Sequence, residues 1–209
     1  MTIEETIENN LKKFSVTAAI LFGSFIEKKE YRDIDIMIVL EEVDDVASIR
    51  KTLSDIDARI DPSFITSIAF KENISIGNPF YLNVLKGKPI IGREYIERCK
   101  EKAGNPSREI IQRYFDLSVH AYRKAKITKE YFDCYVTCKF LIEYLMMREG
   151  MYVTDPHRYD SYLCELGLPL NDEDIQVISR ILMHRRGDME LHDSDVERAM
   201  MVVEKILAL

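Results

Sequence analysis

Apolar residues in the first half of the chain recur with two periods, one typical of helices and one typical of strands. Ile7 and Leu11 fall on one helical face, after a capping-box pattern formed by Thr2 and Glu5. Residues 3–13 are therefore predicted to form a helix. The same analysis predicts, in chain order, strand 16–22, strand 33–40, helix 44–58, strand 63–70, a short helix stopping near Gly87 and a brief strand after it.

The second half of the chain keeps helical spacing up to its end. Gly104-Asn105-Pro106 combines a helix stop with a helix start, so we expect domains at residues 1–104 and 105–209. The predicted helices are two long ones, the second ended by Gly150, then 156–166, 172–185 and a last helix with a capping box at Ser194 and Glu197. Residues 105–209 are predicted to form an all-α antiparallel helical bundle.

Composition and charge narrow the class of protein. The chain has 209 residues, of which 46% are hydrophobic, enough for a packed core. A net charge of −7 excludes the broad basic surface of a general nucleic-acid binder, although a local basic groove stays open. The 4 cysteines form no Cys-x-x-Cys pair and are interpreted as reduced core thiols. Without a signal-peptide pattern or an apolar run of roughly 20 residues, we expect a cytoplasmic protein that does not bind membranes.

The clearest chemical pattern lies between residues 21 and 36. An apolar strand leads into Gly23-Ser24, and a second strand opens with Asp33-Ile34-Asp35. Side chains alternate along a strand, so Asp33 and Asp35 project from one face, roughly 6 to 7 Å apart at the backbone. Two such carboxylates suit Mg²⁺, which completes its ligand shell with water and phosphate oxygens. Gly23 permits a close backbone approach, and free amides after Ser24 would face a phosphate.

This succession of strand, Gly23-Ser24, spacer and Asp33-x-Asp35 resembles the minimal nucleotidyltransferase domains of the DNA polymerase β superfamily. The resemblance implies an α/β (α+β) nucleotidyltransferase-like domain with a short mixed sheet. It implies that Asp33 and Asp35 hold Mg²⁺ (or Mn²⁺) against a nucleoside triphosphate, while Gly23 and Ser24 position the β- and γ-phosphates. The implied reaction transfers a nucleoside monophosphate to a hydroxyl of a protein, an RNA or a small molecule.

A third carboxylate is expected on a later strand of such a domain, as a metal ligand or as the base for the attacking hydroxyl. The predicted strand 63–70 contains no acid, and the nearest candidates are Asp61 before it and Glu72 after it. We prefer Asp61, because Pro62 favours an extended conformation at the preceding residue and could lengthen the strand backward. The alternative is that Asp61 is a solvated turn residue.

A second pattern lies between the last two predicted helices, where five residues separate Arg186 from His192. This spacing resembles the Arg-x(4 to 6)-His signature of HEPN domains, helical bundles often encoded beside or fused to minimal nucleotidyltransferases. By that resemblance, the two residues of each subunit in a dimer would cleave RNA, with His in acid-base work and Arg as a bidentate phosphate ligand. A folding or interface role is the alternative, and the isolated His120 and His157 are interpreted as structural.

Three functions are therefore considered for the whole chain. The first is a nucleotidyltransferase, whose acceptor in paired toxin-antitoxin systems can be a tyrosine of a HEPN partner. The second is a non-catalytic, antitoxin-like nucleotide-binding regulator, which would fit if the third carboxylate is missing. The third is a HEPN-type ribonuclease that uses Arg186 and His192 in a homodimer built through the helical domain.

Overall fold

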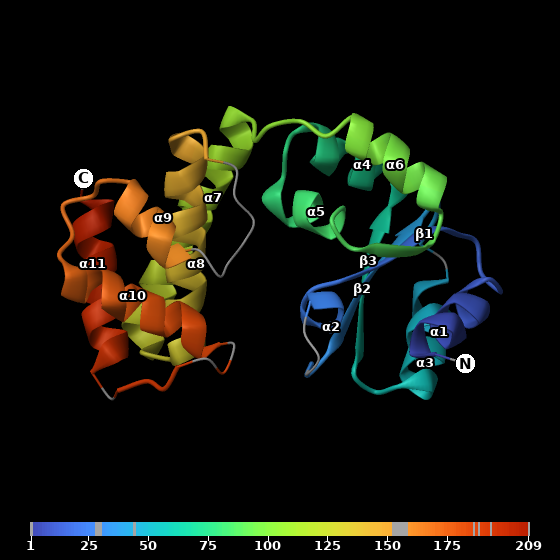
Figure 1. Ribbon diagram of the computed structural model, residues 1–209, viewed down its shortest axis with the longest axis horizontal. Helices are drawn as coiled ribbons and strands as arrows, with labels where there is room; N and C mark the ends of the chain where they lie inside the picture. Colours follow the sequence, from blue (N-terminus) through green and yellow to red (C-terminus); the bar gives the residue numbers. More distant parts are fainter. Residues whose placement is uncertain are drawn as a thin grey trace. The chain divides into compact units, whose positions relative to one another are not determined.

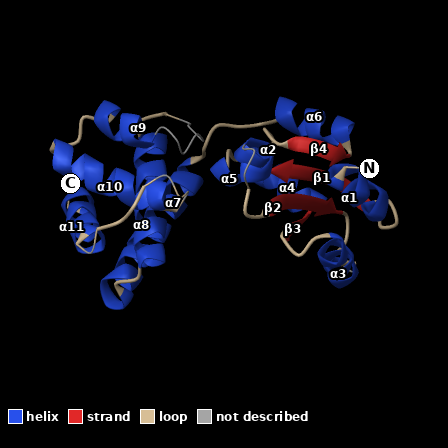
Figure 2. Cartoon of the chain, turned by 60° about the horizontal axis from the view of Figure 1, so that its bottom comes forward, coloured by secondary structure: helices blue, strands red, loops and turns tan. Residues whose placement is uncertain are grey.

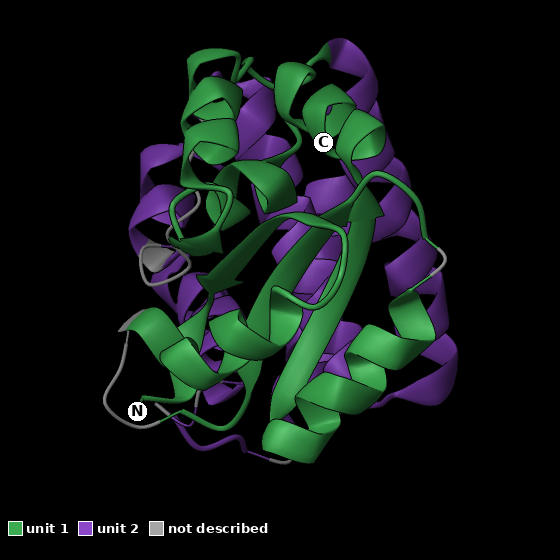
Figure 3. Ribbon diagram, turned by 90° about the vertical axis from the view of Figure 1, so that its right-hand side faces the viewer, with its two compact units in different colours: residues 1–107 green, residues 108–209 purple. Residues whose placement is uncertain are grey.

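The computed structural model describes residues 2–27, 31–43, 45–151, 159–185, 187, 189–192 and 194–208, with the backbone alone at Glu27 and Asp160. The chain divides into two compact units, Met1–Ser107 and Arg108–Leu209, which Figure 3 colours separately. The sequence predicts a domain boundary after residue 104, whereas the two units meet between Ser107 and Arg108. Each unit is described by itself.

A four-stranded mixed sheet forms the centre of the first unit, in agreement with the predicted fold class. Its strands, in the spatial order β3-β2-β1-β4, are drawn in red in Figure 2. Their bounds are β1 Val16–Phe22, β2 Ile34–Leu40, β3 Ile60–Thr66 and β4 Lys88–Ile91. Strand β1 is antiparallel to β2 and to β4, whereas β2 and β3 run parallel. The only parallel pair in this sheet therefore joins the two strands that carry acids near their start.

Helices cover both faces of this sheet (Figure 1). Because side chains alternate along β2, Ile36 and Ile38 pack toward α1 (Ile3–Leu11) and α3 (Val46–Ile56). Met37 and Val39 point to the opposite face. That face is covered by α4 (Ser67–Ser75), α5 (Pro79–Val84) and α6 (Arg93–Glu101). The short α2 (Ser24–Glu27) follows β1 directly.

The predicted strand 63–70 is wrong at both ends. Strand β3 begins at Ile60 and stops at Thr66, because the Thr66 hydroxyl accepts a hydrogen bond from the Ala69 amide (3.2 Å) and caps α4. The Ser67 hydroxyl also donates to Glu41 at the end of β2 (2.7 Å). Beyond Thr66 the buried apolar residues are Phe70 and Ile74, one helical turn apart, whereas Ile68 is exposed.

The sequence pattern predicts no element over residues 93–101, where α6 forms. Only its buried face, made by Tyr95, Ile96 and Cys99, is apolar, and charged residues occupy most other positions. So narrow an apolar face gives a weak periodic signal.

The capping box of Thr2 and Glu5 is confirmed at the start of α1.

The second unit is all-α, as predicted, and consists in its described part of α7 (Arg108–Thr128), α8 (Tyr131–Arg148), α9 (Tyr159–Glu165), α10 (Asp172–His184) and α11 (Asp195–Leu207). Helices α7 and α8 are joined by two residues, and Lys129 in this turn has a φ of 54°. Apolar residues of α8 to α11 form one core. The start of the predicted helix 156–166 lies outside the described residues.

The capping box predicted at Ser194 and Glu197 is wrong. The Ser194 side chain makes no capping hydrogen bond, and the buried carboxylate of Asp195 accepts a hydrogen bond from the His192 amide instead (2.9 Å).

The interpretation of the cysteines as core thiols is confirmed for Cys99, Cys134 and Cys138, but Cys164 is exposed.

Candidate functional site

The register of β1 against β2 places the Gly23-Ser24 turn beside an acid. Phe22 pairs with Asp35, so the turn that follows Phe22 lies at the start of β2. Gly23 has a φ of +69°, and a Cβ built on it would lie 2.4 Å from Asp35 Oδ2. Only glycine fits this position, since a side chain would meet both an unfavourable conformation and the carboxylate.

The parallel register of β2 and β3 brings a second acid to the same place. Asp35 pairs with Asp61, and Met37 pairs with Ser63 one step further along the same face. Asp33 lies two residues before Asp35 and immediately precedes β2. The structure therefore places Asp61 on β3 next to Asp35, and brings both to the end of the sheet where the Gly23-Ser24 turn lies.

The charges at this edge influence one another. Burial raises the pKa of Asp35 to about 6, and the neighbouring carboxylates of Asp33 and Asp61 contribute to this rise, against the opposing charge of Arg32. Arg32 is itself exposed, and its guanidinium lies 3.6 Å from the Asp33 carboxylate. Burial and the two neighbouring carboxylates disfavour the charged form of Asp35, and a bound cation would stabilise that form.

The donor set at this edge fits a magnesium ion that keeps water and substrate oxygens. In the described part of the chain, no three Asp, Glu, His or Cys side chains converge closely enough to hold a metal by themselves. Mg²⁺ usually takes one or two carboxylates and completes its octahedral shell with phosphates and water. Asp33 and Asp35 could supply these carboxylates. The Asp35 carboxylate packs against Gly23, so the backbone of the Gly23-Ser24 turn lies close to the place where the cation would bind.

Aromatic and basic residues that no sequence pattern singles out lie near the start of β2. The rings of Phe25 and Tyr31 meet edge to face at 4.7 Å, and the Arg59 guanidinium lies 5.1 Å from the Tyr31 ring centroid. The Arg59 carbonyl accepts a hydrogen bond from the Ile34 amide (2.9 Å). Isolated residues of common types carry no sequence signal, so only the fold could reveal that they gather at the start of β2.

Glu72, the other candidate for the third acid, lies elsewhere. It is exposed on α4 and lines a hollow between α4 and α6, whereas Asp61 pairs directly with Asp35. The structure therefore brings one of the two candidates to the acid pair and not the other.

The second pattern is only partly described. Arg186 and His157 lie outside the described residues, and His192 is exposed. The backbone of His192 is held by Asp195 through two hydrogen bonds of 2.9 Å, one of them to the Asp195 carboxylate. His120 is exposed on α7.

Comparison with known proteins finds a family match within the first unit. Residues 4–95 match the family model described as "Polymerase beta, Nucleotidyltransferase", a segment that contains the Gly23-Ser24 turn, all four strands and the three acids. No curated protein matches the chain with significance. The helical unit lies outside the family match. No helix among the described residues is both long and apolar enough to cross a bilayer.

Proposed function

Taking residues 4–95 as a nucleotidyltransferase-like domain, we propose that this chain transfers a nucleoside monophosphate from a nucleoside triphosphate to a hydroxyl acceptor on a protein, an RNA or a small molecule. The acceptor oxygen forms a bond to the α-phosphorus, the bond to the β-phosphate oxygen breaks, and pyrophosphate leaves. The observation that carries this proposal is the β2–β3 register, which sets Asp61 beside Asp35 at the Gly23 turn.

Each residue at this edge has a role that its position supports. Asp33 and Asp35 would hold Mg²⁺ (or Mn²⁺), which when bound neutralises the charge on the phosphates and the leaving group. The Gly23-Ser24 turn would position the β- and γ-phosphates. Asp61 would accept the proton of the attacking hydroxyl or bind a second cation, because it lies on the strand next to Asp35.

A labelling assay tests the proposal. The protein is incubated with each α-labelled nucleoside triphosphate and Mg²⁺, with protein, RNA and small hydroxyl compounds as acceptors. We expect Asp35→Asn and Asp61→Asn to reduce label transfer by about a hundredfold or more, the usual contribution of one catalytic group. Asp55→Asn is the matched control, because Asp55 is exposed on α3 and pairs with the exposed Lys51 (2.7 Å). Absence of transfer by the wild-type protein with every nucleotide and acceptor would refute the enzyme proposal.

One observation favours a non-catalytic regulator as the second candidate. Asp61 is exposed on β3, so its carboxylate could stay solvated and take no part in proton transfer, while Asp33 and Asp35 would still bind the nucleotide through Mg²⁺. Calorimetric titration separates the two functions. A regulator would bind Mg²⁺-nucleotide through Asp35 without consuming it, whereas a transferase would release pyrophosphate.

The ribonuclease alternative and the associated homodimer rest on sequence alone, because Arg186 lies outside the described residues. A ribonuclease of this type needs both subunits at one phosphate. A monomeric mass in solution would therefore exclude it.

A further inference from the structure

A hollow of about 340 Å³ lies between α4 and α6, on the outside of the helical layer that covers one sheet face. Its volume is at the lower end of the range for small-molecule sites. Its lining includes Ile74, Tyr95 and Cys99 as a buried apolar floor. It shares no residue with the acid edge at Gly23, Asp35 and Asp61, so it is a separate place on the first unit.

Lys71 of α4, Arg98 of α6 and Lys102, which directly follows α6, stand around this floor. The exposed carboxylate of Glu72 also lines the hollow, so its lining carries three cations and one acid. Burial raises the pKa of the Cys99 thiol, and all three cations act against that shift, so their positive charges reach the same point. No described carboxylate lies within ion-pair distance of any of the three. In a chain with a net charge of −7, a lining in which three cations outnumber one acid forms a local anion-attracting site.

The floor of the hollow offers few polar groups. The Tyr95 hydroxyl is already committed to the Ser67 carbonyl (3.2 Å), and Ile74 and Cys99 are only 1% and 4% exposed. The Tyr95 ring lies 5.2 Å from the Lys71 ammonium and packs on Phe70. Sugar hydroxyls and the hydrogen-bonding edges of a base would lose water here without gaining partners. The floor therefore selects an apolar body rather than a nucleotide.

We propose that the hollow between α4 and α6 binds a small amphipathic anion. Its carboxylate or phosphate head lies between Arg98, Lys102 and Lys71, where the guanidinium can bind two oxygens and the ammonium groups add charge. Its alkyl or aryl body covers Ile74, Tyr95 and Cys99. This inference does not depend on the proposed transferase activity, because the two sites share no residue.

Fluorescence of anilinonaphthalene sulfonate, an anion with an aromatic body, measures occupancy of the hollow. Decanoate and decyl phosphate are then added as competitors, which distinguishes a carboxylate from a phosphate head. Decanol is the uncharged match, and adenosine monophosphate is the nucleotide match. We expect the two decyl anions to displace the probe at concentrations about tenfold lower than decanol, with little displacement by the nucleotide. Added salt should weaken binding, because the cations are exposed.

The variant Arg98→Gln with Lys102→Gln localises the binding. We expect it to raise the dissociation constants of the probe and of decanoate about tenfold or more, and Lys71→Gln alone to raise them less. The matched control is Arg93→Gln with Lys100→Gln, which removes the same charge from α6 at positions outside the hollow. Equal affinities in the two double variants, or displacement by decanol as strong as by decanoate, would overturn the proposal. An unchanged thermal midpoint shows that each variant is folded.

Discussion

Gly23 is the residue at which the conformation of a turn and the position of an acid depend on each other. Its left-handed φ of +69° and the 2.4 Å separation that a Cβ would have from Asp35 Oδ2 are two separate obstacles to any other residue. Gly150, which follows α8, has a similar φ of +73°, but a Cβ there would meet no atom of the described residues within 4 Å. The chain therefore contains a matched pair of glycines that differ in the second obstacle.

Gly23→Ala is expected to destabilise its unit more than Gly150→Ala destabilises the helical unit. The left-handed conformation should cost each variant about 1–2 kcal/mol, and the collision should add about 1–3 kcal/mol at Gly23. Chemical denaturation of both variants measures the difference. Removing the carboxylate with Asp35→Ala should abolish most of the excess. If Gly23→Ala is no worse than Gly150→Ala, the turn does not pack against Asp35 as described.

Asp35 is expected to reduce stability at neutral pH in the absence of metal. Its pKa is raised from 3.8 to about 6, so the folded state binds the proton more tightly than the unfolded state does. Stability should then fall as pH rises from about 4 to about 6 and stay lower above that range. Because Asp35 is partly exposed, Asp35→Asn should add only about 1–2 kcal/mol above pH 6 and almost nothing below pH 4.

Denaturation curves in the presence of a chelator, measured across this pH range, test the expectation for Asp35. Asp55→Asn serves as the control, because it removes a carboxylate that is exposed on α3. A pH-independent effect of Asp35→Asn would mean that burial and the neighbouring acids do not act on Asp35. A gain in stability together with lost transfer would fit the general conflict between stability and function at active sites.

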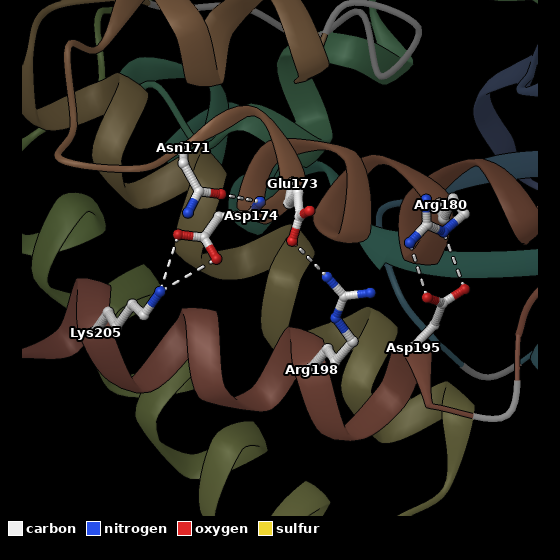
Figure 4. A network of polar contacts seen from close by, with 7 residues as sticks. All are labelled: Asn171, Glu173, Asp174, Arg180, Asp195, Arg198 and Lys205. Atoms are coloured by element: carbon white, nitrogen blue, oxygen red, sulfur yellow. Dashed lines mark hydrogen bonds and ion pairs between the residues drawn. The ribbon is translucent and has the colours of Figure 1, made fainter.

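Among the elements, α10 and α11 are joined by the ion pairs that Figure 4 shows, and these pairs differ widely in burial. Arg180 holds Asp195 through two parallel hydrogen bonds of 3.0 and 2.9 Å, and the Asp195 side chain is 1% exposed. The Arg198 guanidinium also pairs with the Glu173 carboxylate across these two helices (3.1 Å), but the Glu173 side chain is 79% exposed. Burial alone would raise the pKa of Asp195, yet Arg180 and the His192 amide together lower it.

Asp195→Ala is therefore expected to cost about 3–5 kcal/mol, because it leaves the partly buried Arg180 without its partner. Glu173→Ala should cost at most about 1 kcal/mol, as is usual for an exposed pair. Urea denaturation of the two variants gives the comparison. Because the folded pKa of Asp195 is lowered, the difference should be present above pH 3.8 and disappear as pH falls through the folded value. Similar losses in both variants would contradict this assignment.

At the scale of the whole molecule, each unit has an apolar core of its own, and the sequence analysis predicted the type of most elements from their period. Strand β1 was predicted with its observed bounds, because seven consecutive strand residues are followed by a glycine turn. The end of β3 was missed, because the hydrogen bonds that start α4 involve Thr66 and the distant Glu41. Helix α6 was missed because only one narrow face of it is apolar.

The sequence by itself determined the Gly23-Ser24 turn and the strand that begins directly after Asp33 and carries Asp35, since local period and residue type are sufficient for both. Only the tertiary structure decided that Asp61 lies beside Asp35 and that Glu72 does not. The difference lies in strand pairing, which joins residues far apart in the chain and whose register no local pattern specifies. The cationic hollow between α4 and α6 and the Arg180–Asp195 pair have the same origin, because each brings together side chains from two helices that only the folded chain places side by side.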